Sequence, residues 1–462
     1  MADVRALLQR TAELAADFLD SLDDRPVFPQ VSVDDLRAAL RVPLQDDPLE
    51  PERVVEELAA AADPGLVAMP SGRYFGFVIG GGLPAALAAD WLTAAWDQNA
   101  GLYVCGPSAS VTEQVVREWV CDLLALPADA SIGFVTGTQM GSVTALAAAR
   151  FRVLERAGWD VSRDGLAGGP PVRVLVGEKR HVTIDRALRL LGLGTPEVVA
   201  ADTQGRLDVE ALKDALRDGD SPTIVCAQAG EVNTGAFDDF DEIADALPDD
   251  AWLHVDGAFG LWAAASPQLR HLVRGVERAD SWITDAHKWL NVPYDSALVL
   301  CADPEAHRAA MTVSASYLIQ DDARLVRDQV DWVPEFSRRA RGFAVYAALR
   351  SLGRNGLAEL VEQTCRCARR FADGIVELDG VELLNEVVLN QVLFRFESDE
   401  ETDRVLRTVQ DAGDVWMSGT VWDGRRAIRV SVSNWQTTDE EIELALRSFR
   451  AAAQAPAQVP AR

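Results

Sequence analysis

The feature that most constrains the fold is an alternation of short apolar runs with amphipathic helical stretches between residues 131 and 300. The runs are IGFVT, VRVLVG, PEVVAA, TIVCAQ, WLHVD and SWIT, and helical stretches such as SVTALAAARFRVLE, TIDRALRLLG, DVEALKDALR and DEIADAL lie between several of them. This pattern is typical of an α/β fold, in which a mostly parallel sheet is buried between helices. Sheets of this kind bind ligands just beyond the carboxyl ends of their strands.

The flanking segments predict two further units. The N-terminal segment to about Ala62 has apolar residues at helical spacing, and three glycines (80–82) precede a helix that begins near Pro84. We interpret these glycines as an aromatic-lined turn, because no strand of the dinucleotide-binding type precedes them. After Pro334, two long helices, the strands LNQVLFRF and RAIRVSVSN, and a helix from about Thr438 predict a small α+β unit. We expect a helical arm over 1–80, a large α/β domain over 81–333 and a small domain over 334–462.

The composition excludes several classes of partner. The formal net charge is −28, from 44 basic and 72 acidic residues, which opposes binding to nucleic acid or to an anionic membrane. The sequence has no apolar run long enough to span a membrane and no signal-peptide pattern at its N-terminus. Six scattered cysteines favour reduced thiols in the cytoplasm, and their spacing does not predict a metal site.

Lysine is scarce, because it occurs only at positions 179, 213 and 288 among the 44 basic residues. Arginine serves most surface purposes as well as lysine does, so a lysine beside apolar residues suggests that its amine chemistry is needed. Lys288 lies in TDAHKWLNVPYD, directly after the run SWIT.

Polar residues at the predicted strand ends match the needs of pyridoxal 5′-phosphate. The aldehyde of this cofactor needs a lysine amine, which Lys288 would supply, and its ring nitrogen needs a carboxylate, which Asp256 would supply. The phosphate needs N–H groups at a helix N-terminus, which the turn at 136–139 offers. His181 would stack on the ring, and the small Ala258 leaves room at the other face. Each feature by itself is common, so the prediction depends on their joint order along the chain.

HVDGAFG followed by DAHKWLNVPYD resembles the group II pyridoxal-phosphate-dependent decarboxylases, which have fold type I. The resemblance continues in FVTGTQMGSVTALAAAR, EKRHVTIDRALRLLG and AQAGEVNTGAFDDFDEIA and covers about residues 65–450. It implies a homodimer with active sites at the subunit interface and an amino acid as the small-molecule substrate. It also implies a Schiff base on Lys288, with Lys288, Asp256 and His181 as catalytic residues. The cofactor-binding residues that it implies are Thr138, Gln139, His181, Asp256, Ala258, His287 and Lys288.

The sequence departs from the family pattern at two places. Alignment on Trp332 puts Gln329 where relatives carry a loop tyrosine that is thought to return a proton, and Tyr317 lies in the same region as a possible substitute. Glutamine is a poor acid, so the usual proton donor for the route to an amine is missing. Glu231-Val232 replaces paired threonines after the run TIVCAQ, and Glu231 is either a site residue or a surface-loop acid.

The substrate pocket is less defined by the sequence. Tyr74, Phe75 and Phe77 occupy the region that lines the pocket in relatives, and Asn99 follows nearby, although such an aromatic cluster could equally be interface core. Arg429 lies where fold type I enzymes often bind a substrate carboxylate, or else it forms a surface ion pair.

These observations predict a cytoplasmic homodimer that decarboxylates an L-amino acid, with an aromatic or otherwise bulky side chain as the favoured class. The alternatives are a carbon–carbon lyase or aldolase, an oxidative aldehyde-forming decarboxylase and an aminotransferase of the same fold. A DNA-binding regulator is disfavoured, because the N-terminal segment lacks a basic recognition helix.

Overall fold

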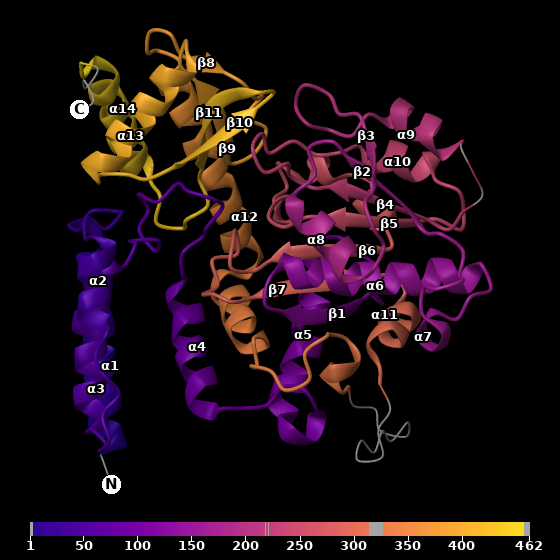
Figure 1. The fold of residues 1–462 in the computed structure, drawn as a ribbon, viewed down its shortest axis with the longest axis horizontal. Helices are drawn as coiled ribbons and strands as arrows, with labels where there is room; N and C mark the ends of the chain where they lie inside the picture. The colour runs from indigo at the N-terminus through magenta and orange to yellow at the C-terminus, as the bar shows by residue number, and fades with distance from the viewer. Residues whose placement is uncertain (1–2, 218, 220, 314–326, 457–462) are drawn as a thin grey trace.

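The computed structural model describes residues 3–217, 219, 221–313 and 327–456. Figure 1 shows a large sheet with helices on its faces, a smaller sheet with its own helices at the C-terminal end of the chain, and an arm of N-terminal helices at one side.

The large sheet has seven strands within the described residues. These are β1 (Ser131–Val135), β2 (Arg173–Gly177), β3 (Glu197–Val199), β4 (Thr223–Gln228), β5 (Trp252–Asp256), β6 (Ser281–Asp285) and β7 (Ala297–Cys301), in the spatial order β1-β7-β6-β5-β4-β2-β3. β7 is antiparallel to both of its neighbours, and the other pairs are parallel. The predicted mostly parallel α/β sheet is therefore confirmed. Every residue of β4, β5 and β6 is buried, which explains why these strands appear in the sequence as continuous apolar runs.

Helices cover both faces of this sheet. They are α5 (Pro107–Leu123), α6 (Thr138–Arg156), α7 (Val161–Asp164), α8 (Val182–Leu190), α9 (Val209–Leu216), α10 (Phe240–Ala246) and α11 (Pro304–Met311). α6 packs directly on β5, β6 and β7. The close approach requires a glycine in the first turns of α6, because a Cβ at Gly141 would lie 2.9 Å from Cγ2 of Ile283.

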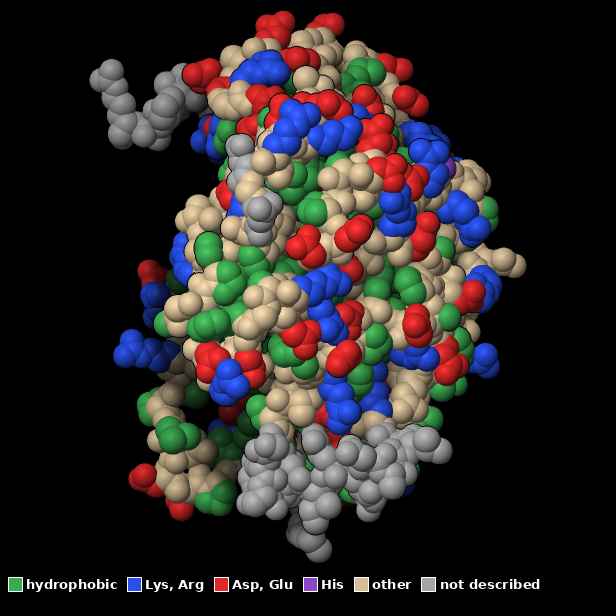
Figure 2. All heavy atoms as spheres, turned by 90° about the vertical axis from the view of Figure 1, so that its right-hand side faces the viewer, with side chains coloured by type: hydrophobic (Ala, Val, Ile, Leu, Met, Phe, Trp, Pro, Cys, Tyr) green, Lys and Arg blue, Asp and Glu red, His purple; other side chains and the backbone are tan. Residues whose placement is uncertain are grey.

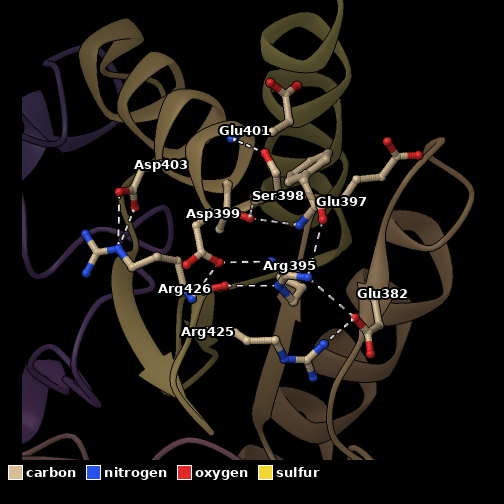
Figure 3. Close-up of polar contacts among 11 residues, drawn as sticks. Glu382, Arg395, Glu397, Ser398, Asp399, Glu401, Asp403, Arg425 and Arg426 are labelled. Atoms are coloured by element: carbon tan, nitrogen blue, oxygen red, sulfur yellow. Dashed lines mark hydrogen bonds and ion pairs between the residues drawn. The ribbon is translucent and has the colours of Figure 1, made fainter.

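The second sheet is antiparallel and lies at the C-terminal end of the chain. Its strands are β8 (Glu382–Leu383), β9 (Gln391–Arg395), β10 (Ser418–Trp422) and β11 (Arg425–Ser431), in the order β10-β11-β9-β8, and α13 (Asp399–Ala412) and α14 (Asp439–Gln454) accompany it. Thr438 forms a capping box with Glu441 at the start of α14. Arg395 at the end of β9 joins the carboxylates of Asp399 and Glu382, as Figure 3 shows.

The helix α12 (Gly342–Ile375) connects the two sheets. Gly353 has φ +60° and ψ −175°, a backbone conformation that residues with a side chain rarely adopt. The segment α12 is therefore two helices joined at a glycine, as the sequence predicted. The segment SRRARG, which the sequence would allow as the start of the first of these helices, lies before α12 except for its final glycine. Arg338 instead forms a buried bidentate pair with Glu113 on α5. Apolar residues of α12 contribute to the cores beneath both sheets, and the three-part division of the chain stays a prediction.

The N-terminal arm consists of α1 (Val4–Asp20), α2 (Val33–Leu40) and α3 (Pro51–Ala62), and α4 (Pro84–Trp96) follows it. α1 and α3 lie side by side at the edge of Figure 1. The three arm helices contain no buried residue, and leucines such as Leu8 and Leu58 are exposed. The apolar stripe of the arm is therefore not covered within one chain.

The molecular surface carries both signs of charge. Figure 2 shows one face on which acidic and basic side chains are interspersed. Of the helices in the described residues, none combines the length and the apolar character that crossing a bilayer requires.

Candidate active site

The predicted site residues meet at one edge of the large sheet. β5 and β6 are adjacent and parallel, so the acids at their carboxyl ends, Asp256 and Asp285, lie at the same edge. His181 caps α8 in the connection after β2, and Thr138 begins α6 directly after β1. The chain turns after β6 and places Lys288 beside the same edge.

Lys288 forms an ion pair with Asp285. Its Nζ lies 2.8 Å from Oδ2 of Asp285. Burial by itself would raise the pKa of Asp285, but the positive charge of Lys288, the nearby imidazole of His287 and the hydrogen bonds from Lys288 and Thr138 hold it below its usual value. Asp285 is therefore ionised at neutral pH, although its side chain is buried.

The turn at the start of α6 has its donors engaged within the protein. The backbone N–H and the hydroxyl of Thr138 each donate to Asp285, both at 2.8 Å. Gln139 donates to the carbonyl oxygen of Thr183, and its own Oε1 is buried without a partner among the described residues. His287 accepts from the backbone N–H of Ser296 through Nδ1, so its proton is on Nε2, which lies 3.4 Å from Asp285.

Asp256 and His181 influence each other electrostatically. Burial raises the pKa of the Asp256 carboxyl group, and the charges of His181 and Lys288 oppose this shift. Burial lowers the pKa of His181 although part of its side chain is exposed, while Asp256 raises it and Lys288 and Arg429 lower it. Asp256, Lys288 and Arg429 are thus near enough to His181 for their charges to influence its pKa. Ala258, half-buried, receives the N–H of Asp285 on its carbonyl oxygen, which ties the chain after β5 to the end of β6.

Arg429 on β11 is a buried residue of this region and does not form a surface ion pair. Its Nη1 donates to the carbonyl oxygen of Val232 at 3.3 Å, and its Nε is buried without a hydrogen-bond partner among the described residues. Burial lowers the pKa of the guanidinium group, and the negative charge of Glu231 raises it. An anionic group of a ligand would compensate this buried positive charge.

The interpretation of Glu231 as a surface-loop acid was wrong. Its carboxylate is buried and accepts the backbone N–H groups of Asn233 and Thr234 as well as their side-chain donors. Glu231 therefore organises the turn after β4, and both of its oxygens are engaged within that turn.

The three predicted aromatic residues lie in different environments. Phe75 has no exposed surface and packs in the core beneath the second sheet, so its assignment to a substrate pocket is corrected. Tyr74 is buried and stacks on Trp416 at 5.2 Å, and burial raises the pKa of its phenol to about 12. Phe77 also stacks on Trp416, at 5.7 Å, but is 56% exposed.

Tyr294 connects this aromatic group with the lysine segment. Its ring stacks on His287 at 4.3 Å. Partial burial, with Asp285 and Tyr74 nearby, raises the pKa of its phenol, although 55% of the residue is exposed.

Asn99 and Gln329 are two further residues that the sequence singled out, and their side chains have different surroundings. The side chain of Asn99 accepts the N–H groups of Gly101 and Arg338 and donates to Ser337, and none of its hydrogen bonds in the described part of the chain reaches Asp256 or Lys288. Gln329 is fully buried in a short 3₁₀ turn (Gln329–Asp331), and its amide has no partner among the described residues. Tyr317 lies outside the described residues.

The residues present fit pyridoxal 5′-phosphate by their chemistry. An amine, a buried carboxylate and an imidazole face one region at the sheet edge, beside the N-terminus of the 19-residue helix α6. Gly137 is the N-cap of this helix, and a Cβ at this position would approach the described atoms no closer than 3.5 Å, to Cε1 of His287. The groups that the aldehyde, the ring nitrogen and the phosphate require are thus available from this chain.

Sequence reasoning assigned no role to three residues of this region. Asp285 is the last residue of a buried strand just as Asp256 is, so its position at the strand end was noted, but its contacts with Lys288 and Thr138 were not foreseen. Tyr294 is in the quoted lysine segment, but the stacking on His287 depends on how the chain turns back. Trp416 lies between α13 and β10, and nothing in the sequence around it indicates contact with residue 74.

The comparisons with known proteins agree with this geometry. The family described as the pyridoxal-dependent decarboxylase conserved domain matches residues 34–397. The chain is 26% identical to an aromatic-L-amino-acid decarboxylase of Bacillus atrophaeus, with 98% of this chain and 96% of that protein covered. It is 31% identical to an L-2,4-diaminobutyrate decarboxylase of Rhizobium meliloti (strain 1021), with 77% and 73% covered.

A solved structure extends the likeness to the fold and to the cofactor. The crystal structure of Oryza sativa TDC with PLP and tryptamine superimposes with a TM-score of 0.91 at 25% identity, over 98% of this chain and 97% of that one. With the family match, this agreement identifies both the fold type and the cofactor. The chain belongs to the family of pyridoxal-phosphate-dependent amino acid decarboxylases.

Proposed function

We propose that this enzyme decarboxylates an L-amino acid with an aromatic or otherwise bulky side chain, with its cofactor bound to Lys288. The observation that carries the assignment of residues is the convergence of Lys288, Asp256 and His181 at the carboxyl ends of β2, β5 and β6. When bound, the cofactor supplies an electron sink for the bond that is broken.

Asp256 and His181 have complementary roles in this proposal. The Asp256 carboxylate would hold the ring nitrogen and keep a proton on it, because a buried anion stabilises an adjacent cation. The imidazole of His181 would stack on the ring and restrict its orientation. Burial lowers the pKa of His181, so at neutral pH the imidazole is neutral and adds no positive charge next to the ring.

Thr138, Gln139 and His287 form the proposed phosphate site. They lie at the N-terminus of α6, where the helix dipole favours an anion. In the structure both donors of Thr138 are bonded to Asp285. Binding of the phosphate by Thr138 therefore requires that these bonds be shared or exchanged.

Arg429 is the proposed partner of the substrate carboxylate. Its guanidinium group is close enough to His181 to lower the pKa of that imidazole, and one of its nitrogens has no partner. Holding the carboxylate here would fix which bond of the substrate stands across the ring. Phe77, Tyr74 and Trp416 provide an aromatic surface for the side chain, and this surface supports the preference for a bulky substrate.

The assignment of Lys288 is tested by trapping. Reduction of the reconstituted enzyme with borohydride is expected to attach the cofactor covalently to the peptide that contains Lys288. The visible absorbance is expected to vanish in Lys288→Ala and to persist in the control Lys213→Ala, whose lysine is on the exposed helix α9. Trapping at Lys179 or Lys213 would overturn the assignment.

Oxidative decarboxylation to an aldehyde, in place of simple decarboxylation to an amine, is the second candidate function, and Gln329 favours it. This glutamine stands where relatives carry the loop tyrosine, and its amide is buried and cannot donate an acidic proton. A panel of L-amino acids, with carbon dioxide, amine, aldehyde and ammonia measured separately, decides between the two exits. Amine without aldehyde supports simple decarboxylation, whereas aldehyde and ammonia in equal amounts support the oxidative exit.

We further propose that the enzyme is a cytoplasmic homodimer. The exposed apolar stripe of α1–α3 supports pairing with a second copy of the chain. Free cysteines are typical of proteins in a reducing intracellular compartment.

A further inference from the structure

The ion pair between Lys288 and Asp285 differs from the surface pairs of the other two lysines. The side chain of Asp285 is 2% exposed and that of Lys288 is 23% exposed, with 2.8 Å between Nζ and Oδ2. Lys213 pairs with Glu210 and Lys179 with Asp423, and both of those carboxylates are exposed. A pair with a buried carboxylate interacts more strongly than an exposed pair, because water screens it less.

The carboxylate of Asp285 is fixed from several sides. Thr138 donates to both of its oxygens, and Nε2 of His287 lies 3.4 Å from Oδ1. Its backbone is held as well, since its N–H donates to Ala258 and its carbonyl oxygen accepts from the indole of Trp262. Oδ2 therefore has a defined position, and that position faces the lysine amine.

We infer that Asp285 is a positioning residue that holds the unbound amine of Lys288 as an ammonium ion and thereby sets how readily this amine reacts with an aldehyde. The inference rests on the proposed role of Lys288. A protonated amine has no lone pair and cannot attack a carbonyl carbon, so a carboxylate that stabilises the ammonium form slows the attack. The same contact keeps the side chain at the site whenever it is not bonded to the cofactor.

Other charges at the site do not replace this contact. Asp256 also faces Lys288 electrostatically, but no ion pair within 4.0 Å joins them among the described residues. His181 and His287 would disfavour the ammonium form only if they were protonated, and burial lowers the pKa of both. Asp285 is thus the acid in direct contact with the amine.

Competitive labelling tests the inference on the full-length enzyme without cofactor. A limiting amount of acetic anhydride reacts only with unprotonated amines, and mass spectrometry gives the ratio of labelling at Lys288 to labelling at Lys213 in the same molecules. In Asp285→Asn this ratio is expected to rise about 10-fold near neutral pH, which corresponds to about 1.4 kcal/mol of lost preference for the ammonium form. Asp285→Glu keeps the charge and is expected to restore a low ratio.

A matched control separates this role from a general loss of ion pairs. Asp423→Asn removes the carboxylate that contacts Lys179 at 2.7 Å, and it is expected to leave the ratio for Lys288 unchanged. An unchanged ratio in folded Asp285→Asn, or an equal rise in Asp423→Asn, would overturn the inference. If Asp285→Asn does not fold, Thr138→Val removes the hydroxyl that orients Oδ2, and the ratio is expected to rise about 3-fold because the contact is loosened. No rise in folded Thr138→Val would also count against it.

Failure of the inference can be distinguished from failure of the proposed function. Borohydride trapping of the cofactor at Lys288 tests the function, and acetic anhydride labelling tests Asp285. Trapping at Lys288 with an unchanged labelling ratio would reject only the role of Asp285. Trapping at another lysine would reject the proposed function itself.

Discussion

Two acids at the ends of adjacent strands, Asp256 and Asp285, have pKa values that are shifted in opposite directions. Burial raises the pKa of Asp256, whereas the lysine and the donors of Thr138 lower the pKa of Asp285. The difference follows from which donors reach each carboxylate, since both residues are buried. Asp256 keeps only the N–H of Ala258 as a hydrogen bond among the described residues, so it remains available to a ligand.

Arg429 and Arg426 allow a matched test on one strand. Arg429→Gln is expected to raise KM for the amino acid by about 10- to 100-fold, because a charge-assisted hydrogen bond to the carboxylate is lost. Arg426, also on β11, pairs with the exposed Asp403, and Arg426→Gln is expected to leave KM unchanged. Steady-state kinetics with the best substrate of the panel measures both. Equal KM values for the two variants would remove Arg429 from the site.

Elements far from the site are held together by buried polar contacts. His307 on α11 donates from Nε2 to the carbonyl oxygen of Trp332 and accepts from the hydroxyl of Ser131 on β1. It thus joins three segments, and it must be neutral to do so. Burial lowers its pKa from 6.5 to about 3.

This burial predicts a pH dependence of stability. Below pH 6.5 the unfolded chain binds a proton at position 307 and the folded chain does not, so stability falls as pH decreases from 6.5 toward 3. Between neutral pH and about pH 5, the free energy of unfolding of His307→Gln is expected to fall by about 2 kcal/mol less than that of the wild type. Urea unfolding at the two pH values measures this. His271→Gln, which changes an exposed histidine, is expected to follow the wild type.

The ion-pair network of the second sheet contains buried and exposed arginines. Arg395 is buried and contacts Asp399 together with the carbonyl oxygens of Glu397 and Arg426 (Figure 3), while Arg425 is exposed and pairs with Glu382. Arg395→Ala is expected to lower the free energy of unfolding by about 2 kcal/mol, and Arg425→Ala by less than about 1 kcal/mol. Urea denaturation followed by circular dichroism compares them. Equal losses would show that burial of Arg395 does not matter.

At the scale of the whole molecule, the N-terminal arm has an apolar face that the rest of the described chain does not cover. The apolar side chains of α1–α3 contact water in a single chain, which is unfavourable unless another surface covers them. A second copy is the occupant that the proposed dimer supplies.

Two substitutions that place carboxylates on the apolar face of the arm test the proposed dimer. Leu8→Glu combined with Leu58→Glu is expected to convert a particle of twice the chain mass into one of the single mass, because burying two carboxylates at an interface is costly. Val376→Glu, at an exposed apolar position beyond α12, is expected to leave the mass unchanged. Light scattering gives the mass. A wild-type protein of single mass would contradict the proposal.

The sequence by itself determined the class of fold and the choice of residues proposed to hold the cofactor. Most strands from β1 to β6 are buried on both faces and therefore apolar, so they were visible as runs. Asp256 and Lys288 were visible because they stand at the ends of such runs or just after them. The antiparallel β7 was not predicted, because its run follows the lysine segment without a helix between them, so it does not continue the strand–helix alternation.

Only the tertiary structure decided which partner each polar group has. Asp285 contacts Thr138 and Lys288, and the charge of Arg429 on the second sheet influences the pKa of His181, across separations that no local pattern specifies. Phe75 and Phe77 are two residues apart, yet one is in a core and the other is exposed. Local sequence fixes the type of an element through backbone geometry and apolar spacing, whereas contacts between distant side chains depend on how the elements pack.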